Sequence, residues 1–170
     1  MNMVLQIRPE TPEDVDAITA LTAQAFLNAP HTSHTEHFIV NALRAVGQLS
    51  VSSVAEDDGN LLGHVALSPV TVSDGSTGWY GLGPISVVPA QQGKGIGSQL
   101  MQHALAALQV LGAGGCVVLG DPGYYRRFGF SPQPGLVLDG VPPEYFMVLR
   151  LHGPLPQGGV QYHAAFEATE

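Results

Sequence analysis

Hydrophobic residues follow a helical period in two segments near the amino terminus. Apolar positions from Val15 to Ala25, spaced three or four residues apart, predict a helix. It begins at residues 11–14, because Thr11 can cap a helix and proline and acids suit its first turn. A second apolar stripe, 38–46, predicts another helix that begins with the capping-box pattern 33–36 and ends at Gly47.

The period then changes to one that is typical of strands. Residues 5–8 alternate and predict a first strand. Segments 49–55 and 61–72 flank the turn signal at 57–60 and therefore predict an antiparallel hairpin. Residues 79–88 predict a third strand, in which Pro84 indicates a bulge or a place where backbone pairing stops.

A glycine-rich loop at 89–97 leads into a long amphipathic helix that Gly112 can end. The apolar segment 116–119 predicts a strand covered on both faces. The remaining predicted elements are a short helix at 121–127 and strands at 145–151 and 160–163. This order predicts an α+β fold with a mixed sheet and at least one βαβ unit around the loop.

The composition suits a single domain spanning residues 1–170, because 45% of the residues are hydrophobic. Charged residues make up 12% of the chain and the net charge is −8, which argues against a sequence-independent nucleic-acid partner. The single cysteine, Cys116, excludes an internal disulfide. With no secretory signal and no apolar run of roughly 18–20 residues, we expect a cytoplasmic protein with no membrane partner. A homodimer is a possible assembly.

The glycine-rich loop carries the most informative chemistry. The first N–H groups of a helix lack internal partners and carry partial positive charge. Glycines at alternate positions let an oxyanion approach them, and Lys94 can add charge, so we favour a phosphate site over a loop that merely tolerates glycine. A nucleoside triphosphate loop does not fit, because Gly95 follows Lys94 and Val88 stands five before Gly93. A dinucleotide fingerprint is a near miss at Ser98.

Residues 92–97 (Gln-Gly-Lys-Gly-Ile-Gly) resemble the Gln/Arg-x-x-Gly-x-Gly/Ala signature of the GNAT acyl-CoA N-acyltransferase superfamily. Residues 83–89 look like the central strand of that family, and 125–130 resemble its Tyr-x-x-x-Gly-Phe motif. Residues 120–125 are additionally similar to its YhbS-like branch. The clear resemblance covers about residues 79–131, and the layout agrees over most of the chain.

The resemblance implies the GNAT fold, in which the two central strands, here 79–88 and 115–120, splay apart between flanking helices. It implies acetyl-CoA as the acetyl donor and no metal. The pantetheine arm would pair with the backbone of Ile85, Ser86 and Val87. The pyrophosphate would lie on the amides of residues 92–97, which are Gln92, Gly93, Lys94, Gly95, Ile96 and Gly97.

The expected reaction is direct attack of a neutral amine on the thioester carbonyl. The backbone N–H of Val87 is the candidate donor to the carbonyl oxygen as it gains charge. By resemblance, Tyr125 protonates the departing thiolate and borders the cofactor; the alternative is an aromatic ring that only packs. We expect Tyr124 to be structural or a wall of the cofactor site. Asp121 is favoured as a helix cap rather than as the general base, and Glu36 as a capping-box residue. His64 and Glu144 stay open as surface or pocket residues, so no base is assigned.

Two further groups favour structural interpretations. His31, His34 and His37 recur every third residue, and we favour a polar loop bordering the acceptor pocket over a metal site. Cys116 stands in an apolar strand, so a buried, inert thiol is favoured over an acyl carrier. The acceptor is a small-molecule or peptide amine. The alternative function is a non-catalytic sensor of acyl-CoA with the same fold, and a nucleotide-dependent enzyme is a weaker third reading.

Overall fold

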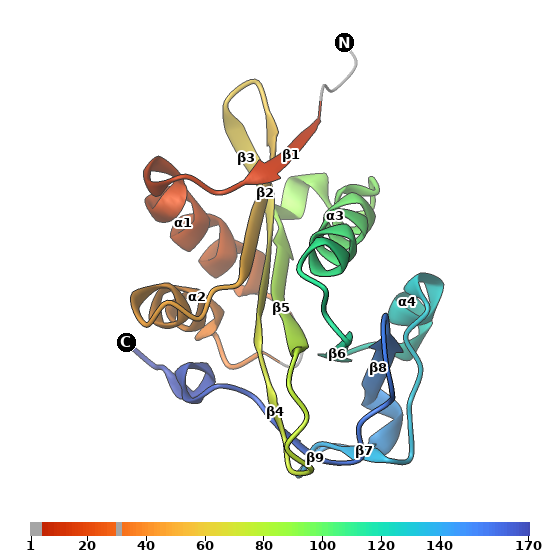
Figure 1. Cartoon of the computed structure of the whole chain (residues 1–170). Helices are drawn as coiled ribbons and strands as arrows, with labels where there is room; N and C mark the ends of the chain where they lie inside the picture. Colours follow the sequence, from red (N-terminus) through yellow and green to blue (C-terminus); the bar gives the residue numbers. More distant parts are fainter. Residues whose placement is uncertain (1–4, 30–31) are drawn as a thin grey trace.

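The computed structural model describes residues 5–29 and 32–170. A mixed six-stranded sheet has the order β1-β2-β3-β5-β6-β8, and a small sheet with the order β4-β9-β7 lies at one end of it (Figure 1). The strands of the main sheet are β1 (Gln6–Pro9), β2 (Val51–Asp57), β3 (Asn60–Pro69), β5 (Trp79–Val87), β6 (Gly115–Leu119) and β8 (Phe146–Arg150). Those of the small sheet are β4 (Thr71–Val72), β7 (Leu136–Val137) and β9 (Gly158–Gln161).

Helices cover both faces of the main sheet. The α-helices are α1 (Val15–Phe26), α2 (Glu36–Ala45), α3 (Ile96–Val110) and α4 (Pro122–Tyr125). Single turns of 3-10 helix stand at Pro12–Asp14, Pro89–Gln91, Arg126–Phe128, Pro143–Tyr145 and Ala164–Glu167. Helices α1 and α2 pack on one face of the central strands, and α3 packs on the other (Figure 1). We call these the α1 face and the α3 face.

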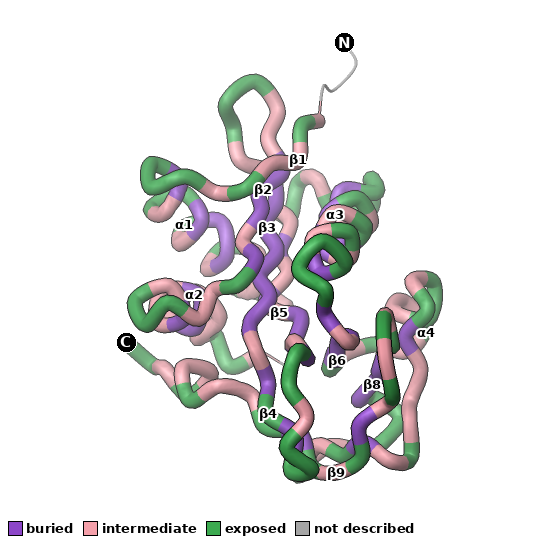
Figure 2. Tube along the Cα trace, in the orientation of Figure 1, coloured by how far each residue is buried: buried purple, intermediate pink, exposed green. Residues whose placement is uncertain are grey.

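The core lies between the sheet and these helices, where Figure 2 shows buried backbone along β2, β3 and β5. On the α3 face, Leu100 and Leu108 of α3 pack in one cluster with Val65 of β3. On the α1 face, Ile18 of α1 packs with Val54 of β2. Each buried leucine or isoleucine contributes about 1.5–3 kcal/mol, so the helical stripes seen in the sequence hold α1 and α3 against the sheet.

Most predicted elements are confirmed. The hairpin β2–β3 is antiparallel, and α3 ends where Gly112 takes a φ of +73°. The second helix begins at Glu36, three residues after the predicted start at Ser33. The N-cap is Thr35, which makes no side-chain cap bond, so the predicted capping box with Ser33 as N-cap is wrong. The Glu36 carboxylate does accept hydrogen bonds from the Ser33 N–H and hydroxyl, which hold the segment just before the helix.

The predicted strand at 61–72 is wrong in one respect. The main-sheet strand β3 ends at Pro69, and Thr71–Val72 pair instead with β9 in the small sheet. One further bond, from Val70 N to the carbonyl of Trp79 (3.0 Å), follows Pro69 before the chain leaves the main sheet. Strand β9 begins two residues before the predicted 160, and the two-residue strand β7 was not predicted, because its partner lies about twenty residues further along the chain.

The central strands part as expected. Val65 lies opposite Ile85 but Leu67 lies opposite Leu82, so the Gly83-Pro84 step, a cis peptide, is a bulge in β5. Strand β5 pairs in parallel with β6 only over 79–81. Strand β6 stays paired with β8 as far as Leu119. The β5–α3–β6 unit therefore opens into a gap beside residues 82–87.

Candidate active site

The loop before α3 presents backbone donors that the protein itself does not use. Gly93 and Gly95 adopt φ values of +79° and +85°, and Gly95 is the N-cap of α3. Within the described part of the chain, no hydrogen-bond partner is found for the amides of residues 93–98; the first bonded amide of the helix is Gln99, which donates to Gly95 O (3.2 Å). Six free N–H groups at a helix N-terminus make a ready site for an anion.

The Gln92 amide is different from its neighbours. It donates to the carbonyl of Pro89 (3.3 Å), so it is not free to hold a phosphate as the sequence analysis expected. Its side chain instead donates to the carbonyl of Val87 (3.1 Å). Gln92 therefore connects the loop to the end of β5, and the free N–H donors begin at Gly93.

A cavity of about 290 Å³ lies against these amides. Its walls come from the end of β5, the loop and the segment after β6; they are Val87, Gln91, Gln92, Gly93, Gly95, Ile96, Gly97, Ser98, Tyr124 and Arg127. A Cβ on Gly97 would lie 3.0 Å from the hydroxyl of Tyr124, so any side chain here would crowd this wall of the cavity. The cavity fits a diphosphate group because it combines unpartnered donors with one cation.

That cation is Arg127, which the sequence analysis missed. The Arg127 guanidinium lies 4.5 Å from the centre of the Tyr124 ring, which places it at the cavity wall. The Lys94 ammonium instead contacts Gln91 Oε1 (3.4 Å) and is exposed. A signal was present in the spacing, because Arg127 follows Tyr124 by three residues and such residues share one side of a helical turn.

The gap between β5 and β6 exposes backbone groups of β5. Val88 N donates to Leu62 O (2.9 Å), toward β3. Backbone groups alternate direction along a strand, so the N–H and C=O of Val87 and Ile85 point away from β3, into the gap. The bond from Gln92 to Val87 O agrees with this direction. Ser86, by the same alternation, directs its backbone to β3, and its buried side chain lies on the α1 face.

Tyr125 is the last residue of α4, and its part-buried ring packs against Gly120, which directly follows β6. A Cβ on Gly120 would lie 2.5 Å from its ring, and its ring meets Tyr124 edge-on at 5.0 Å between centres. Burial, with smaller effects of Tyr124, Cys116 and Asp121, raises the pKa of Tyr125 to about 12. Its phenol therefore carries a proton at neutral pH. Tyr124, not Tyr125, lines the cavity described above.

Other candidate groups have structural positions. Asp121 Oδ1 accepts from Gly123 N (3.0 Å) and caps α4, which confirms the helix-cap prediction. Cys116 is fully buried and burial raises its pKa, as expected of an inert thiol. Glu144 is exposed on a 3-10 turn. His31 lies outside the described residues, and among those described no group of three or more His, Cys, Asp or Glu side chains is placed to hold a metal.

A polar group on the α1 face was missed by the sequence analysis. Four buried side chains there have polar atoms without a hydrogen-bond partner among the described residues; they are Thr22, His64, Ser68 and Ser86. His64 has a partner on its other side: its Nε2 lies 2.7 Å from Ser52 Oγ. Strand alternation alone places His64 and Ser68 on one face, but it does not tell which face α1 covers.

Comparisons with known proteins agree with this geometry. A family model described as "Acetyltransferase (GNAT) domain" matches residues 48–132. The Escherichia coli K12 protein described as "Uncharacterized N-acetyltransferase YhbS" is 39% identical over 126 residues, which is 74% of this chain and 72% of that protein. The chain belongs to the GNAT family of acetyltransferases.

Two solved structures extend the likeness to the whole chain. A GNAT family acetyltransferase from Brucella melitensis, in complex with acetyl-CoA, is 47% identical with a TM-score of 0.86, covering 97% of this chain and 99% of that one. Escherichia coli YhbS, in complex with CoA, is 34% identical with a TM-score of 0.88, covering 100% and 96%. These structures confirm the predicted fold and the resemblance to the YhbS-like branch. Within the described residues, no helix is both long and apolar enough to span a membrane.

Proposed function

We propose that this chain binds acetyl-CoA between β5 and β6 and transfers the acetyl group directly to an amine. One observation carries the proposal: the free amides of residues 93–98 stand beside a gap that exposes the backbone of β5. A diphosphate needs the first feature, and an extended amide-bearing arm needs the second. The two related structures with CoA and acetyl-CoA support the same ligand.

The binding residues follow from the directions of their backbone groups. The amides of Gly93, Lys94, Gly95, Ile96 and Gly97 hold the diphosphate, and Arg127 adds a positive charge. Ile85 pairs with a pantetheine amide, because its backbone groups point into the gap. Val87 contributes its N–H at the thioester end of the arm, because its carbonyl already accepts from Gln92. Ser86 does not pair with the arm, because its backbone groups point to β3. Gln92 contributes through its bond to Val87.

The chemistry needs one donor and two proton movements. Val87 N–H donates to the thioester carbonyl oxygen as the amine attacks, and it stabilises the charge that develops there. The C–N bond forms and the C–S bond breaks. Tyr125, whose phenol holds its proton, protonates the sulfur that leaves. The amine must lose one proton in the same reaction.

The acceptor is a small-molecule or peptide amine. The net charge of −8 favours cationic acceptors, because an acidic surface attracts them at long range. The single domain over residues 1–170, the cytoplasmic location and the homodimer stay predictions from the sequence.

The test measures binding and thiol release separately. Calorimetry with acetyl-CoA should give binding that NAD and ATP do not reproduce. Thiol release should then appear with at least one member of an amine panel: spermidine, kanamycin, the twenty amino acids and a short peptide with a free amino terminus. Gly95→Glu should abolish binding, because it places a negative side chain where a phosphate belongs. Binding without thiol release from any amine would favour the sensor instead.

A further inference from the structure

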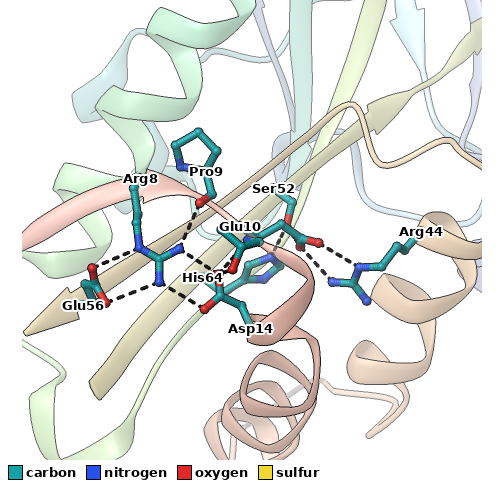
Figure 3. A network of polar contacts seen from close by, with 9 residues as sticks. Arg8, Pro9, Glu10, Asp14, Arg44, Ser52, Glu56 and His64 are labelled. Carbon is teal, nitrogen blue, oxygen red and sulfur yellow. Dashed lines mark hydrogen bonds and ion pairs between the residues drawn. The ribbon is translucent and has the colours of Figure 1, made fainter. Parts of the chain in front are cut away.

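The structure brings His64 into a polar chain that runs across the α1 face. Arg44 of α2 forms two hydrogen bonds with Glu10, at 2.9 and 2.8 Å. Glu10 accepts from the Ser52 hydroxyl of β2, and Ser52 Oγ lies 2.7 Å from His64 Nε2 of β3 (Figure 3). Through Glu10, this series of polar contacts links α2, β2 and β3. It ends at His64, which is completely buried.

The hydrogen bonds of Ser52 decide which nitrogen of His64 carries the proton. Burial alone would raise the pKa of Glu10, but the hydrogen bonds from Arg44 and Ser52 outweigh it and leave that pKa below its usual value. Glu10 is therefore a carboxylate, which only accepts. The one hydroxyl proton of Ser52 goes to Glu10, so Ser52 must accept from His64. The ring then carries its proton on Nε2 and a free lone pair on Nδ1.

The free lone pair on Nδ1 has no protein partner among the described residues. Burial lowers the pKa of His64 to about 4, with Arg44 acting in the same direction and Glu10 against it. The ring is therefore neutral at physiological pH. A buried acceptor atom left without a donor costs about 1–3 kcal/mol, which indicates a position kept for a ligand or a proton.

His64 is the cross-strand neighbour of the residue that precedes Val87. In the β3–β5 ladder His64 is paired with Ser86, so both side chains lie on the α1 face. Ser86 directly precedes Val87, whose N–H we assign to the thioester carbonyl. The hydroxyl of Ser86 also lacks a partner among the described residues. The two unpartnered atoms thus stand on the opposite face of β5 from α3, on the side of the sheet that α1 and α2 cover.

From this geometry we infer that His64 Nδ1 is the base that takes the proton of the acceptor amine, and that Ser52 and Glu10 position it. The inference rests on the proposed function. As the C–N bond forms, the nitrogen becomes strongly acidic, so a weakly basic imidazole is sufficient to accept its proton. The resulting positive charge is stabilised through Ser52 by the Glu10 carboxylate, in the manner of a third group that orients a base. One proton leaves the amine and one reaches the sulfur, and water returns the His64 proton to Tyr125.

Glu10 and Ser52 also connect the site with solvent. Together with Arg44 they line a cavity of about 320 Å³ at the other end of the polar chain. The Glu10 side chain keeps 18% of its surface exposed, whereas His64 has none. The polar chain is therefore open to solvent at Glu10, which is ionised, and closed to solvent at His64, whose Nδ1 carries no proton.

The first test needs no acceptor. Nitrogen NMR of histidine-labelled protein, with His64→Gln to assign the signal, should show His64 protonated on Nε2 and not on Nδ1 at pH 7. Ser52→Ala should lose this preference, and Ser52→Thr, which keeps the hydroxyl, should retain it. A ring protonated on Nδ1 in the wild type would overturn the inference.

The second test uses the panel amine that gives the fastest thiol release. His64→Gln should lower kcat about 100-fold, the lower end for loss of a general base, while the Kd for acetyl-CoA stays within about twofold. Ser52→Ala should also lower kcat, and Ser52→Thr should restore it. Ser53→Ala is the matched control, because Ser53 is a buried neighbour on the same strand that faces away from His64. Full turnover in His64→Gln would overturn the inference alone, whereas no thiol release in the wild type would overturn the proposed function and with it the role of His64.

Discussion

Gln92 Nε2 donates to the backbone carbonyl of Val87 across 3.1 Å, so the loop that opens α3 is tied to the end of β5. The two parts of the cofactor site belong to these two segments. The free amides come from the loop, and the gap-facing N–H comes from Val87. This side-chain hydrogen bond adds to the backbone bonds from Gln91 N to Val88 O and from Gln92 N to Pro89 O in holding the loop against the end of β5.

Replacing Gln92 by alanine should loosen this connection. A hydrogen bond of this kind contributes about 0.5–1.5 kcal/mol, so we expect the Kd for acetyl-CoA to rise about 2- to 10-fold. Calorimetry measures it directly. Gln99→Ala, an exposed position one turn into α3, serves as the control and should bind like the wild type. Equal affinity of the Gln92 variant and the wild type would show that the tie is not needed.

Gly95→Ala should weaken binding more than its effect on stability explains. An alanine at a φ of +85° costs about 1–2 kcal/mol of folding free energy, although nothing lies within 4 Å of its Cβ. Gly59→Ala is a matched control, because Gly59 has a φ of +82° and equally open surroundings in the β2–β3 turn. Thermal unfolding should shift similarly in both variants, and only Gly95→Ala should raise the Kd for CoA. Unchanged binding in Gly95→Ala would argue against a phosphate at this loop.

Arg127→Gln should reduce affinity in a salt-dependent way. A charge-assisted hydrogen bond contributes about 1.5 kcal/mol or more, which corresponds to a Kd about 10-fold higher. The neighbouring Arg126→Gln removes the same charge from a position that does not line the cavity. Titrations at two salt concentrations should show that the difference between the variants shrinks as salt increases. The same loss in both variants would mean that only net charge matters.

Local sequence signals were sufficient to predict much of the fold and the glycine-rich loop of the candidate site. The cap at Asp121 and the bulge at Pro84 each depend on a few adjacent residues, and both are found where the sequence places them. Parallel pairing that stops at Gly81 followed from the family resemblance rather than from any local pattern.

The polar group around His64 on the α1 face depends on contacts between segments that are distant in the sequence. His64 meets Ser52, and Ser52 meets Glu10, only because β1, β2 and β3 lie side by side, which no spacing along the chain reveals. The backbone of Ser86 was expected to pair with the pantetheine arm. Its register with β3 directs its backbone groups to β3 instead. Sequence periodicity predicts which positions are buried, but pairing determines which polar groups come together.

Lowering the pH should reduce the free energy of unfolding, because Asp14 becomes protonated. Hydrogen bonds from Arg8, opposed by burial and aided by Thr11, lower the pKa of Asp14 from 3.8 to about 2. The ionised carboxylate therefore stabilises the fold fully above pH 4, and this contribution disappears as the pH falls toward 2. Because the Arg8 side chain is 24% exposed, we expect only about 1 kcal/mol. Urea unfolding of Asp14→Asn should show this deficit at pH 7 and none near pH 2, with exposed Asp16→Asn as control; a deficit that persists near pH 2 would assign it to packing.

Tyr125→Phe should separate catalysis from binding. The phenol, with a pKa near 12, holds a proton that the departing sulfur can take, and phenylalanine keeps the ring packed beside Gly120 but removes that proton. We expect kcat to fall about 100-fold with the Kd for acetyl-CoA changed less than about twofold. Tyr124→Phe is the informative comparison, since Tyr124 lines the diphosphate cavity and should affect Kd more than kcat. Stopped-assay kcat values and calorimetric Kd values for the two variants would give opposite patterns, and a Tyr125→Phe enzyme with full turnover would remove Tyr125 from the proton path and leave water as the acid.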